Sequence, residues 1–260
     1  MIDLKGHAAF ITGASRGVGR AIAEAFAEAG AHVVVNSRKF SDDTQSLLDK
    51  CKSLGVSASF VPGDLSDQTE KVVDEVFHAA TAARPDIDIL VNNAGQYFDV
   101  PFLEMDCERF FKTIRLNVAS GYFLTQRFAR RWVAGKTPGR VLFIGSINGK
   151  LAEQVSTAYD SSKGAVEMMV RTLAVALAPH NIRVNGLAPG LVRTPQTSWL
   201  DRQPAKAAWI AHHTPNGRIP DAAACGPGAV YLVSDAASHV HGHMLMIDGG
   251  MSVWQQPEPM

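Results

Sequence analysis

A tyrosine and a lysine, Tyr159 and Lys163, lie four residues apart. On a helix this spacing places the phenol and the ammonium group on one face. A phenol titrates near ~10 in water, and a close cation favours its phenolate. We therefore expect the pKa of Tyr159 to lie below that of a free phenol, which would make it a usable general acid or base. Taken alone, the same spacing is also typical of an exposed helix pair.

A glycine-rich segment near the N-terminus, Thr12-Gly13-Ala14-Ser15-Arg16-Gly17-Val18-Gly19, has the composition of a phosphate-binding loop. Glycines there allow a tight turn, a close approach to a pyrophosphate and close packing of a helix, whose N-terminus presents free N–H groups. The spacing differs from the strict G-x-G-x-x-G, and a glycine cluster can simply be a tight turn. Its position between a first strand and a first helix favours dinucleotide binding.

The end of the second expected strand, Asn36-Ser37-Arg38, indicates which dinucleotide binds. No carboxylate is there to hydrogen-bond the ribose hydroxyls of NAD. Arg38 and Arg16 could instead pair with the 2′-phosphate of NADP through the fork geometry of their guanidinium groups, or both could be solvated surface charges. Asp64 and Leu65 follow the third strand at the edge where ligands bind, although an Asp before a helix is also a plausible cap. The sequence predicts NADP(H).

Short apolar runs alternate with helical stretches along the whole chain, which predicts β-α-β units and a parallel sheet. Strands are expected at Ala8–Thr12, His32–Asn36, Val56–Val61, Ile87–Val91, Arg140–Ile144, Ile182–Leu187 and Met244–Ile247. Helices are expected at Val18–Ala29, Asp42–Leu54, Asp67–Ala82, from about Leu103, and at Ser156–Leu177. The sequence thus predicts one α/β domain over residues 1–260, a doubly wound parallel seven-stranded sheet with helices on both faces. The stretch from Gly190 to Pro220 is long for a connection and is a candidate substrate lid.

The bulk composition limits the classes of partner. Of 260 residues, 46% are hydrophobic and 19% charged, as in an ordinary globular protein. Basic and acidic residues number 25 each, so nothing indicates a nucleic-acid or membrane-surface binder. The three cysteines are far apart, which argues against a disulfide framework or a zinc site. No signal peptide and no run long enough to cross a bilayer is evident. We expect a cytoplasmic protein whose partners are small molecules or other proteins.

Several motifs in order resemble the short-chain dehydrogenase/reductase family over essentially the whole length. They are the glycine loop, Asn92-Asn93-Ala94-Gly95, Asn117, Ser146, Tyr159 with Lys163, Pro189-Gly190 with Thr194, and Ile247-Asp248-Gly249-Gly250. The chain is most similar to the 3-oxoacyl-acyl-carrier-protein reductase and related ketoreductases. This resemblance implies a Rossmann-type fold and an NADP(H)-dependent reduction of a ketone, carrier-bound or small, to a secondary alcohol. It does not identify the substrate, the direction or the stereochemistry.

The resemblance also implies a role for each matching residue. Tyr159 would donate the proton, Ser146 would hydrogen-bond the carbonyl oxygen, Lys163 would bind the nicotinamide ribose and depress the pKa of Tyr159, and Asn117 would hold a water that relays protons. The expected cofactor contacts are Gly13, Ser15, Arg16, Gly17, Val18, Gly19, Asn36, Ser37, Arg38, Asp64, Leu65, Asn92, Ala94, Gly95, Tyr159, Lys163, Pro189, Gly190, Val192 and Thr194. Each polar residue has an ordinary alternative as a turn, helix or loop residue.

Two further features of the sequence are a histidine-rich stretch and apolar helix faces. His239, His241 and His243 alternate along one stretch, but without a nearby carboxylate or thiolate cluster no metal site is expected. Apolar helix faces exceed what covering one sheet requires, around Phe110, Phe111, Leu116 and Val118 and around Val166, Met169, Val170 and Leu173. In the resembling family these helices form a subunit interface, so a homotetramer is expected, unless the faces are buried internally.

Other functions remain open from the sequence. A non-catalytic NADP(H)-binding regulator or sensor could keep the same fold, and a scaffold protein would need no cofactor at all. The combination of Asn117, Ser146, Tyr159 and Lys163 favours an enzyme, because a pure binding module has no chemical need for a tyrosine beside a lysine.

Overall fold

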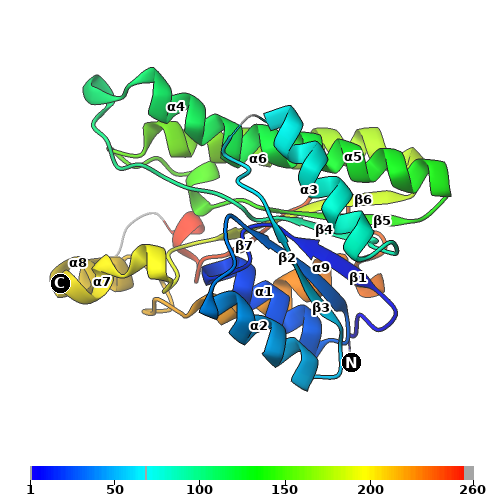
Figure 1. The fold of residues 1–260 in the computed structure, drawn as a ribbon. Helices are drawn as coiled ribbons and strands as arrows, with labels where there is room; N and C mark the ends of the chain where they lie inside the picture. The colour runs from blue at the N-terminus through cyan, green and yellow to red at the C-terminus, as the bar shows by residue number, and fades with distance from the viewer. Residues whose placement is uncertain (1, 68, 255–260) are drawn as a thin grey trace.

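One parallel sheet of seven strands organises the chain in the computed structural model, which describes residues 2–67 and 69–254 (Figure 1). The strands are β1 (Ala8–Ile11), β2 (His32–Ser37), β3 (Ala58–Pro62), β4 (Ile89–Asn92), β5 (Gly139–Ile144), β6 (Ile182–Pro189) and β7 (Met244–Ile247). Their order is β3-β2-β1-β4-β5-β6-β7, with every pair parallel. The order reverses between β1 and β4, and such a switch point opens a crevice at the carboxyl ends of the strands. The predicted sheet is confirmed.

Helices cover both faces of the sheet (Figure 1). The longer ones are α1 (Gly17–Glu28), α2 (Asp42–Ser53), α3 (Thr69–Ala83), α4 (Cys107–Ile114), α5 (Ser120–Gly135), α6 (Thr157–Leu177) and α9 (Gly226–Val233). In Figure 1, α1, α2 and α9 lie on one face, and α3, α4, α5 and α6 on the other. Strands buried on both faces need continuous apolar runs, which is why Ala8–Ile11 and Ile89–Asn92 are buried throughout.

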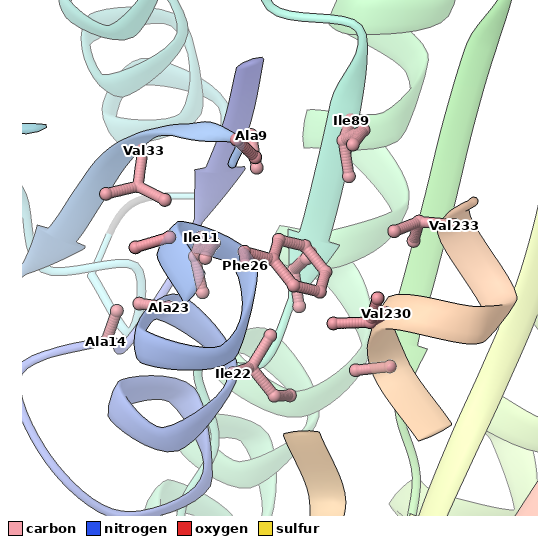
Figure 2. Packing of buried hydrophobic residues seen from close by; sticks show 14 of the residues in the cluster. Ala9, Ile11, Ala14, Ile22, Ala23, Phe26, Val33, Ile89, Val230 and Val233 are labelled. Carbon is pink, nitrogen blue, oxygen red and sulfur yellow. The ribbon is translucent and has the colours of Figure 1, made fainter. Parts of the chain in front are cut away.

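Two hydrophobic cores hold these layers together. In the first, Ile22, Ala23 and Phe26 of α1 and Val230 and Val233 of α9 pack against β1, β2 and β4 (Figure 2). In the second, on the opposite face, the rings of Phe10 and Phe128 stack with centroids 5.8 Å apart, and Phe77 meets Phe128 edge-on. Each core fixes one face of β1, so the loop that follows β1 has a rigid base.

Some boundaries differ from the expected ones. The third strand begins at Ala58 and not at Val56. The helix expected from about Leu103 begins at Cys107, because Asp106 caps it by accepting a hydrogen bond from the backbone N–H of Arg109 at 2.7 Å. Between α4 and α5 the chain makes a π-helical turn over Arg115–Ala119. The sequence analysis missed α9, which starts beside a proline in its first turn.

The segment after β6, residues 190–220, contains a 3₁₀ turn (Pro195–Thr197) and two short helices, α7 (Trp199–Arg202) and α8 (Pro204–His212). In Figure 1, α7 and α8 project to the side of the layered body. Much of the stretch predicted as a candidate substrate lid is therefore helical, and its function as a lid stays a prediction. We refer to residues 190–220 as the lid segment.

The helix faces expected to join subunits are mostly internal. Val166, Met169 and Val170 are buried in the second core, and Leu116, Val118 and Leu173 pack against it. Of the expected set, only Phe111 counts among the exposed large hydrophobic residues, at 54%. Other apolar side chains on these helices are exposed instead: Tyr122, Phe123 and Val133 on α5, and Met168 and Val175 on α6. No helix in the described part of the chain is long and apolar enough to cross a membrane.

Candidate active site

The glycine loop connects β1 to α1 at the switch point of the sheet. Gly13 and Gly17 have positive φ angles of 63° and 61°, which a residue with a side chain adopts only under strain. Gly19 has no room for a side chain, since an added Cβ would lie 2.4 Å from Nδ2 of Asn93. Arg16 is the N-cap of α1 without a side-chain capping bond, and the first turn holds no acidic residue. This arrangement leaves the first backbone N–H groups of α1 available to a phosphate.

Asn93, which the sequence analysis did not assign to the cofactor site, ties the glycine loop to the end of β4. Its Nδ2 donates to the carbonyl oxygens of Thr12 at 2.8 Å and Gly13 at 3.1 Å. The Thr12 hydroxyl accepts from the backbone N–H groups of Asn93 and Ala94, both at 3.0 Å. Asn93 and Thr12 thus position the backbone of Ala94 and Gly95 beside the glycine loop. The repeated asparagine in Asn92-Asn93 was the available signal.

The polar residues at the end of β2 have different environments. Asn36 is buried, and its Nδ2 donates to the carbonyl oxygens of Val61 and Gly63, so its amide joins the ends of β2 and β3. The Ser37 hydroxyl donates to the carbonyl oxygen of Lys39 at 2.9 Å. Arg38 and Arg16 are both exposed, and neither forms an ion pair within residues 2–67 and 69–254. That these two guanidinium groups bind the 2′-phosphate stays a prediction.

Several other residues that were expected to contact the cofactor also make contacts within the protein. Asp64 accepts hydrogen bonds from the backbone N–H and the hydroxyl of Ser66, at 3.0 and 2.7 Å, which is the local turn role weighed against cofactor binding. Leu65 and Val192 are buried, so only their backbones can reach a ligand. Thr194 lies opposite the glycine loop, because a Cβ on Gly17 would be 3.5 Å from its methyl group.

The loop after β6 runs close to the end of β7. The backbone N–H of Gly190, directly after Pro189, donates to the carbonyl oxygen of Ile247 at 3.0 Å. An added Cβ on Gly190 would lie 3.0 Å from the backbone of Asp248. The lid segment therefore starts from a fixed point at the carboxyl edge of the sheet.

Tyr159, Lys163 and Ser146 come together at the carboxyl end of β5. The first turns of α6 carry the tyrosine and the lysine, and Nζ of Lys163 lies 5.5 Å from the centroid of the Tyr159 ring. Lys163 is only 6% exposed, and its ammonium donates to the carbonyl oxygen of Ile144, the last residue of β5, at 2.8 Å. The hydroxyl of Ser146, two residues further on, lies close enough to the phenol of Tyr159 to lower the pKa of that group. The structure thus places a phenol, a hydroxyl and a buried ammonium group at one end of the sheet.

Burial controls the protonation of both helix residues. It raises the pKa of Tyr159 to about 12, although the nearby Ser146 hydroxyl acts in the opposite direction. Burial also lowers the pKa of Lys163 to about 8. The expected pKa below that of a free phenol is therefore wrong for the chain by itself. The reason is the burial of the phenol, which the ammonium group of Lys163, directed at the carbonyl oxygen of Ile144, does not offset.

Asn117 lies at the centre of the π-helical turn and is buried. Its Oδ1 accepts from the backbone N–H of Gln96, and its Nδ2 donates to the carbonyl oxygen of Gln96 and to the hydroxyl of Ser162, each at 2.9 Å. Both amide hydrogens are therefore used within the protein. Single π-turns inside helices occur frequently at functional sites. Here Asn117, in the π-helical turn, connects the loop that follows β4, at Gln96, to Ser162 on α6, which precedes Lys163.

The loop before α6 is held by a carboxylate that the sequence analysis assigned no role. Asp160 accepts from Nδ2 of Asn148 at 2.8 Å and from the backbone N–H of Glu153 at 2.7 Å. The Ser146 hydroxyl in turn accepts from the backbone N–H of Asn148 at 3.1 Å. Asp160 thus fixes the loop that carries Ser146 against the helix that carries Tyr159.

The histidines near β7 do not form a metal cluster in the structure. His239, His241 and His243 are all exposed, and burial lowers the pKa of His241. Among residues 2–67 and 69–254, no group of three or more His, Cys, Asp or Glu side chains could hold a metal ion. Cys51 and Cys225 are buried and Cys107 is exposed, and all three are free thiols.

Comparison with known proteins identifies a family. Residues 13–252 match the family described as enoyl-(acyl carrier protein) reductase. The chain is 34% identical to 5-keto-D-gluconate 5-reductase of Escherichia coli K12 over 253 residues, covering 97% of this chain and 98% of that protein. It is 33% identical to L-rhamnose 1-dehydrogenase (NADP(+)) of Thermoplasma acidophilum, covering 97% and 99%.

Solved structures share the fold along nearly the whole chain. A gluconate 5-dehydrogenase from Burkholderia cenocepacia, in complex with NADP and tartrate, is 30% identical, with a TM-score of 0.90 and coverage of 98% of both chains. A 3-oxoacyl (acyl-carrier-protein) reductase from Agrobacterium tumefaciens with NADP bound is 31% identical, with a TM-score of 0.88 and coverage of 95% of both chains. A short-chain alcohol dehydrogenase from Sinorhizobium meliloti has a TM-score of 0.91 at 32% identity, covering 96% and 98%.

Proposed function

The chain belongs to the short-chain dehydrogenase/reductase family, and on that premise we propose that it interconverts a ketone and a secondary alcohol with NADP(H) as hydride carrier. The observation that carries the proposal is the cluster of Tyr159, Ser146 and Lys163 at the carboxyl end of β5, next to a glycine loop whose helix N-terminus is open to phosphate. A non-catalytic sensor would need the loop but not the cluster.

The cofactor fits the described residues. The glycine loop excludes side chains at Gly13 and Gly19, and the backbone of Ala94 lies against it. Neither Arg16 nor Arg38 forms an ion pair among residues 2–67 and 69–254. These residues would hold the pyrophosphate and the 2′-phosphate. When bound, NADPH supplies the hydride that reaches the carbonyl carbon. The relatives named above that carry or use NADP support this choice.

Side chains of the protein donate the proton that the ketone oxygen receives during reduction. Tyr159 is protonated throughout the neutral range, because its pKa is about 12, so it can donate to the oxygen of a ketone during reduction. Ser146 hydrogen-bonds the same oxygen and stabilises the charge that develops there. Lys163 would bind the ribose and place a positive charge near the phenol. Asn117 holds Ser162, the residue next to Lys163, in place through a hydrogen bond.

For the substrate, the relatives support a class different from the 3-oxoacyl chains that the sequence motifs led us to expect. Two of the relatives act on a keto-gluconate and on rhamnose, and one neighbouring structure holds tartrate. These names support a polyhydroxylated sugar or sugar acid over a 3-oxoacyl chain as substrate. A panel containing 5-keto-D-gluconate, L-rhamnose and a 3-oxoacyl thioester, tested with both nicotinamide cofactors, distinguishes these classes. Absence of turnover with every ketone and alcohol would reject the proposed function.

Arg38→Asp should reverse the cofactor preference. The change removes a charge-assisted hydrogen bond worth about 1.5–3 kcal/mol and adds repulsion against the 2′-phosphate. We expect kcat/KM for NADPH to fall by ~10²-fold or more while that for NADH stays within a few-fold. Lys52→Asp, a charge reversal at an exposed position on α2, is the control and should change neither value. Equal use of NADPH and NADH by the unmodified protein would reject the role of Arg38.

We infer that the protein assembles as a homotetramer through the exposed apolar side chains of α4, α5 and α6. Val175 is 78% exposed and Met168 and Phe111 just over half exposed, which is unusual for large apolar residues on neighbouring helices. Light scattering should give a mass about four times 27.9 kDa, and Val175→Glu should lower it. Leu54→Glu, an exposed apolar position at the end of α2, is the control. A monomer for the unmodified protein at micromolar concentration would overturn the interface.

A further inference from the structure

We propose that Tyr97 is a positioning residue that latches the lid segment over Tyr159 and thereby sets the affinity for the carbonyl substrate. The inference rests on the proposed function, since it takes Tyr159 as the proton donor. Nothing in the sequence motifs or in the comparisons assigns a role to Tyr97.

One side of Tyr97 contacts the catalytic cluster. Its ring meets the ring of Tyr159 edge-on, with centroids 5.8 Å apart and an interplanar angle of 64°. Aromatic pairs at such distances and angles attract each other beyond their area of contact. The ring of Tyr97 therefore restricts where the phenol of Tyr159 can lie.

The other end of Tyr97 contacts the lid segment. Its hydroxyl donates to the carbonyl oxygen of Gln196 at 3.3 Å. Burial raises the pKa of Tyr97, and the side chain of Trp199 lies close enough to the hydroxyl to oppose that shift. Gln196 lies in the 3₁₀ turn that begins the lid's helical part, and Trp199 is the first residue of α7. A single side chain thus connects the proton donor to two consecutive elements of the lid segment.

The two parts of the lid segment that Tyr97 contacts are connected to the rest of that segment by further interactions. The turn that holds Gln196 is closed by a capping box, in which the side chains of Thr194 and Thr197 each accept from the other residue's backbone N–H. The ammonium group of Lys206, on α8, lies 4.4 Å from the centroid of a Trp199 ring. The 3₁₀ turn, α7 and α8 are therefore coupled. The contacts that Tyr97 makes with the turn and with Trp199 thus restrain the whole lid segment.

The two ends of this connection differ in strength. Gln96, the residue before Tyr97, is fixed, because the side-chain amide of Asn117 forms hydrogen bonds with both its backbone N–H and its carbonyl oxygen, each at 2.9 Å. The bond to Gln196 is longer and in an exposed place. When the lid segment moves to admit a ligand, the hydroxyl contacts of Tyr97 should break while its ring stays against Tyr159. Tyr97 then acts as a latch on a rigid base.

The hydroxyl and the ring of Tyr97 can be separated by two substitutions. Tyr97→Phe keeps the ring contact but removes the hydrogen bond to Gln196, worth a factor of roughly 2–10 in an equilibrium, together with the polar contact to Trp199. We expect KM for the best ketone of the panel to rise about 5-fold or more with kcat nearly unchanged. Tyr97→Leu also removes the edge contact with Tyr159, so kcat should fall as well. Tyr231→Phe, the same chemical change on α9, is the control and should change neither constant.

Limited proteolysis tests the latch without turnover. Arg202 and Lys206 are exposed trypsin sites in the lid segment. In the cofactor-free protein, Tyr97→Phe should speed cleavage at these sites about 5-fold relative to the unmodified protein, whereas Tyr231→Phe should not. Equal cleavage rates for Tyr97→Phe and the unmodified protein would reject the latch, whatever the enzyme assay shows. Faster cleavage in a protein that reduces no ketone would keep the latch and reject the proposed function.

Discussion

Tyr159→Phe should abolish most turnover while leaving the fold and NADPH binding intact. The substitution keeps the ring, its edge contact with Tyr97 and its place on α6, and it removes only the hydroxyl. That hydroxyl is the group placed to give a proton to the ketone oxygen, and general acid–base catalysis contributes ~10²–10⁴-fold. We therefore expect kcat for ketone reduction to fall by at least ~10²-fold. Steady-state rates, with NADPH binding measured by fluorescence, provide the check.

The control for Tyr159→Phe is Tyr231→Phe, which should retain full activity. Near-normal turnover in a folded, NADPH-binding Tyr159→Phe protein would mean that the proton comes from another group. In that case the role given to the Tyr159, Ser146 and Lys163 cluster is incorrect, even though the family assignment stands.

Lys163→Met should lose at least as much activity as Tyr159→Phe and at the same time stabilise the cofactor-free fold. Activity falls because the change removes both the expected ribose contact and the positive charge near the phenol. Stability rises because Lys163 is only 6% exposed and burial lowers its pKa from 10.5 to about 8, a desolvation cost on the order of 3 kcal/mol. Loss of the hydrogen bond to Ile144 offsets about 1 kcal/mol of that gain. The net gain at pH 7 is about 1–2 kcal/mol.

The gain in stability should depend on pH with a definite sign. Below about pH 8 Lys163 is protonated in both the folded and the unfolded chain, so the unmodified protein bears the whole cost of burying the charge. As the pH rises from about 8 towards 10.5, the folded chain releases this proton first and the cost shrinks. Urea unfolding at pH 7 and pH 10 should therefore show the two proteins converging. A Lys163→Met protein that is less stable at pH 7 would show that the burial cost is overstated.

The sequence predicted the sheet well because parallel strands covered on both faces need unbroken apolar runs. Val33-Val34-Val35 and Ile89-Leu90-Val91 are such runs, and both are central strands of the observed sheet. Helix α9 was missed because Gly226-Pro227-Gly228 has the composition of a turn. In the structure the proline occupies the first turn of a helix, where its missing N–H costs nothing, and Ala229, Val230 and Val233 turn to the core.

The sequence predicted the candidate site in its residue types but not in its electrostatics. Spacing alone places Tyr159 and Lys163 on one helical face, but it does not show that the ammonium group points at the carbonyl of Ile144. Without that knowledge the sign of the Tyr159 pKa shift could not be predicted. Nor could the clamp between Asn117 and Gln96, because it depends on a π-turn that brings distant residues together.

The lid segment was the least predictable region. Its helices are short, α7 with four residues and α8 with nine, so their apolar spacing gives a weak periodic signal. The connection from Tyr97 to Gln196 and Trp199 joins residues about a hundred positions apart, which no local pattern indicates.

The most direct test of the account follows a labelled hydride. The unmodified protein is incubated with NADPH deuterated at the transferring position of nicotinamide C4 and with each ketone of the panel, and the products are analysed by mass spectrometry. We predict an alcohol that carries one deuterium on its carbinol carbon, formed with NADPH in preference to NADH and nearly absent with Tyr159→Phe. An NADPH-binding protein that yields no deuterated alcohol from any ketone would contradict it and would favour a sensor over an enzyme.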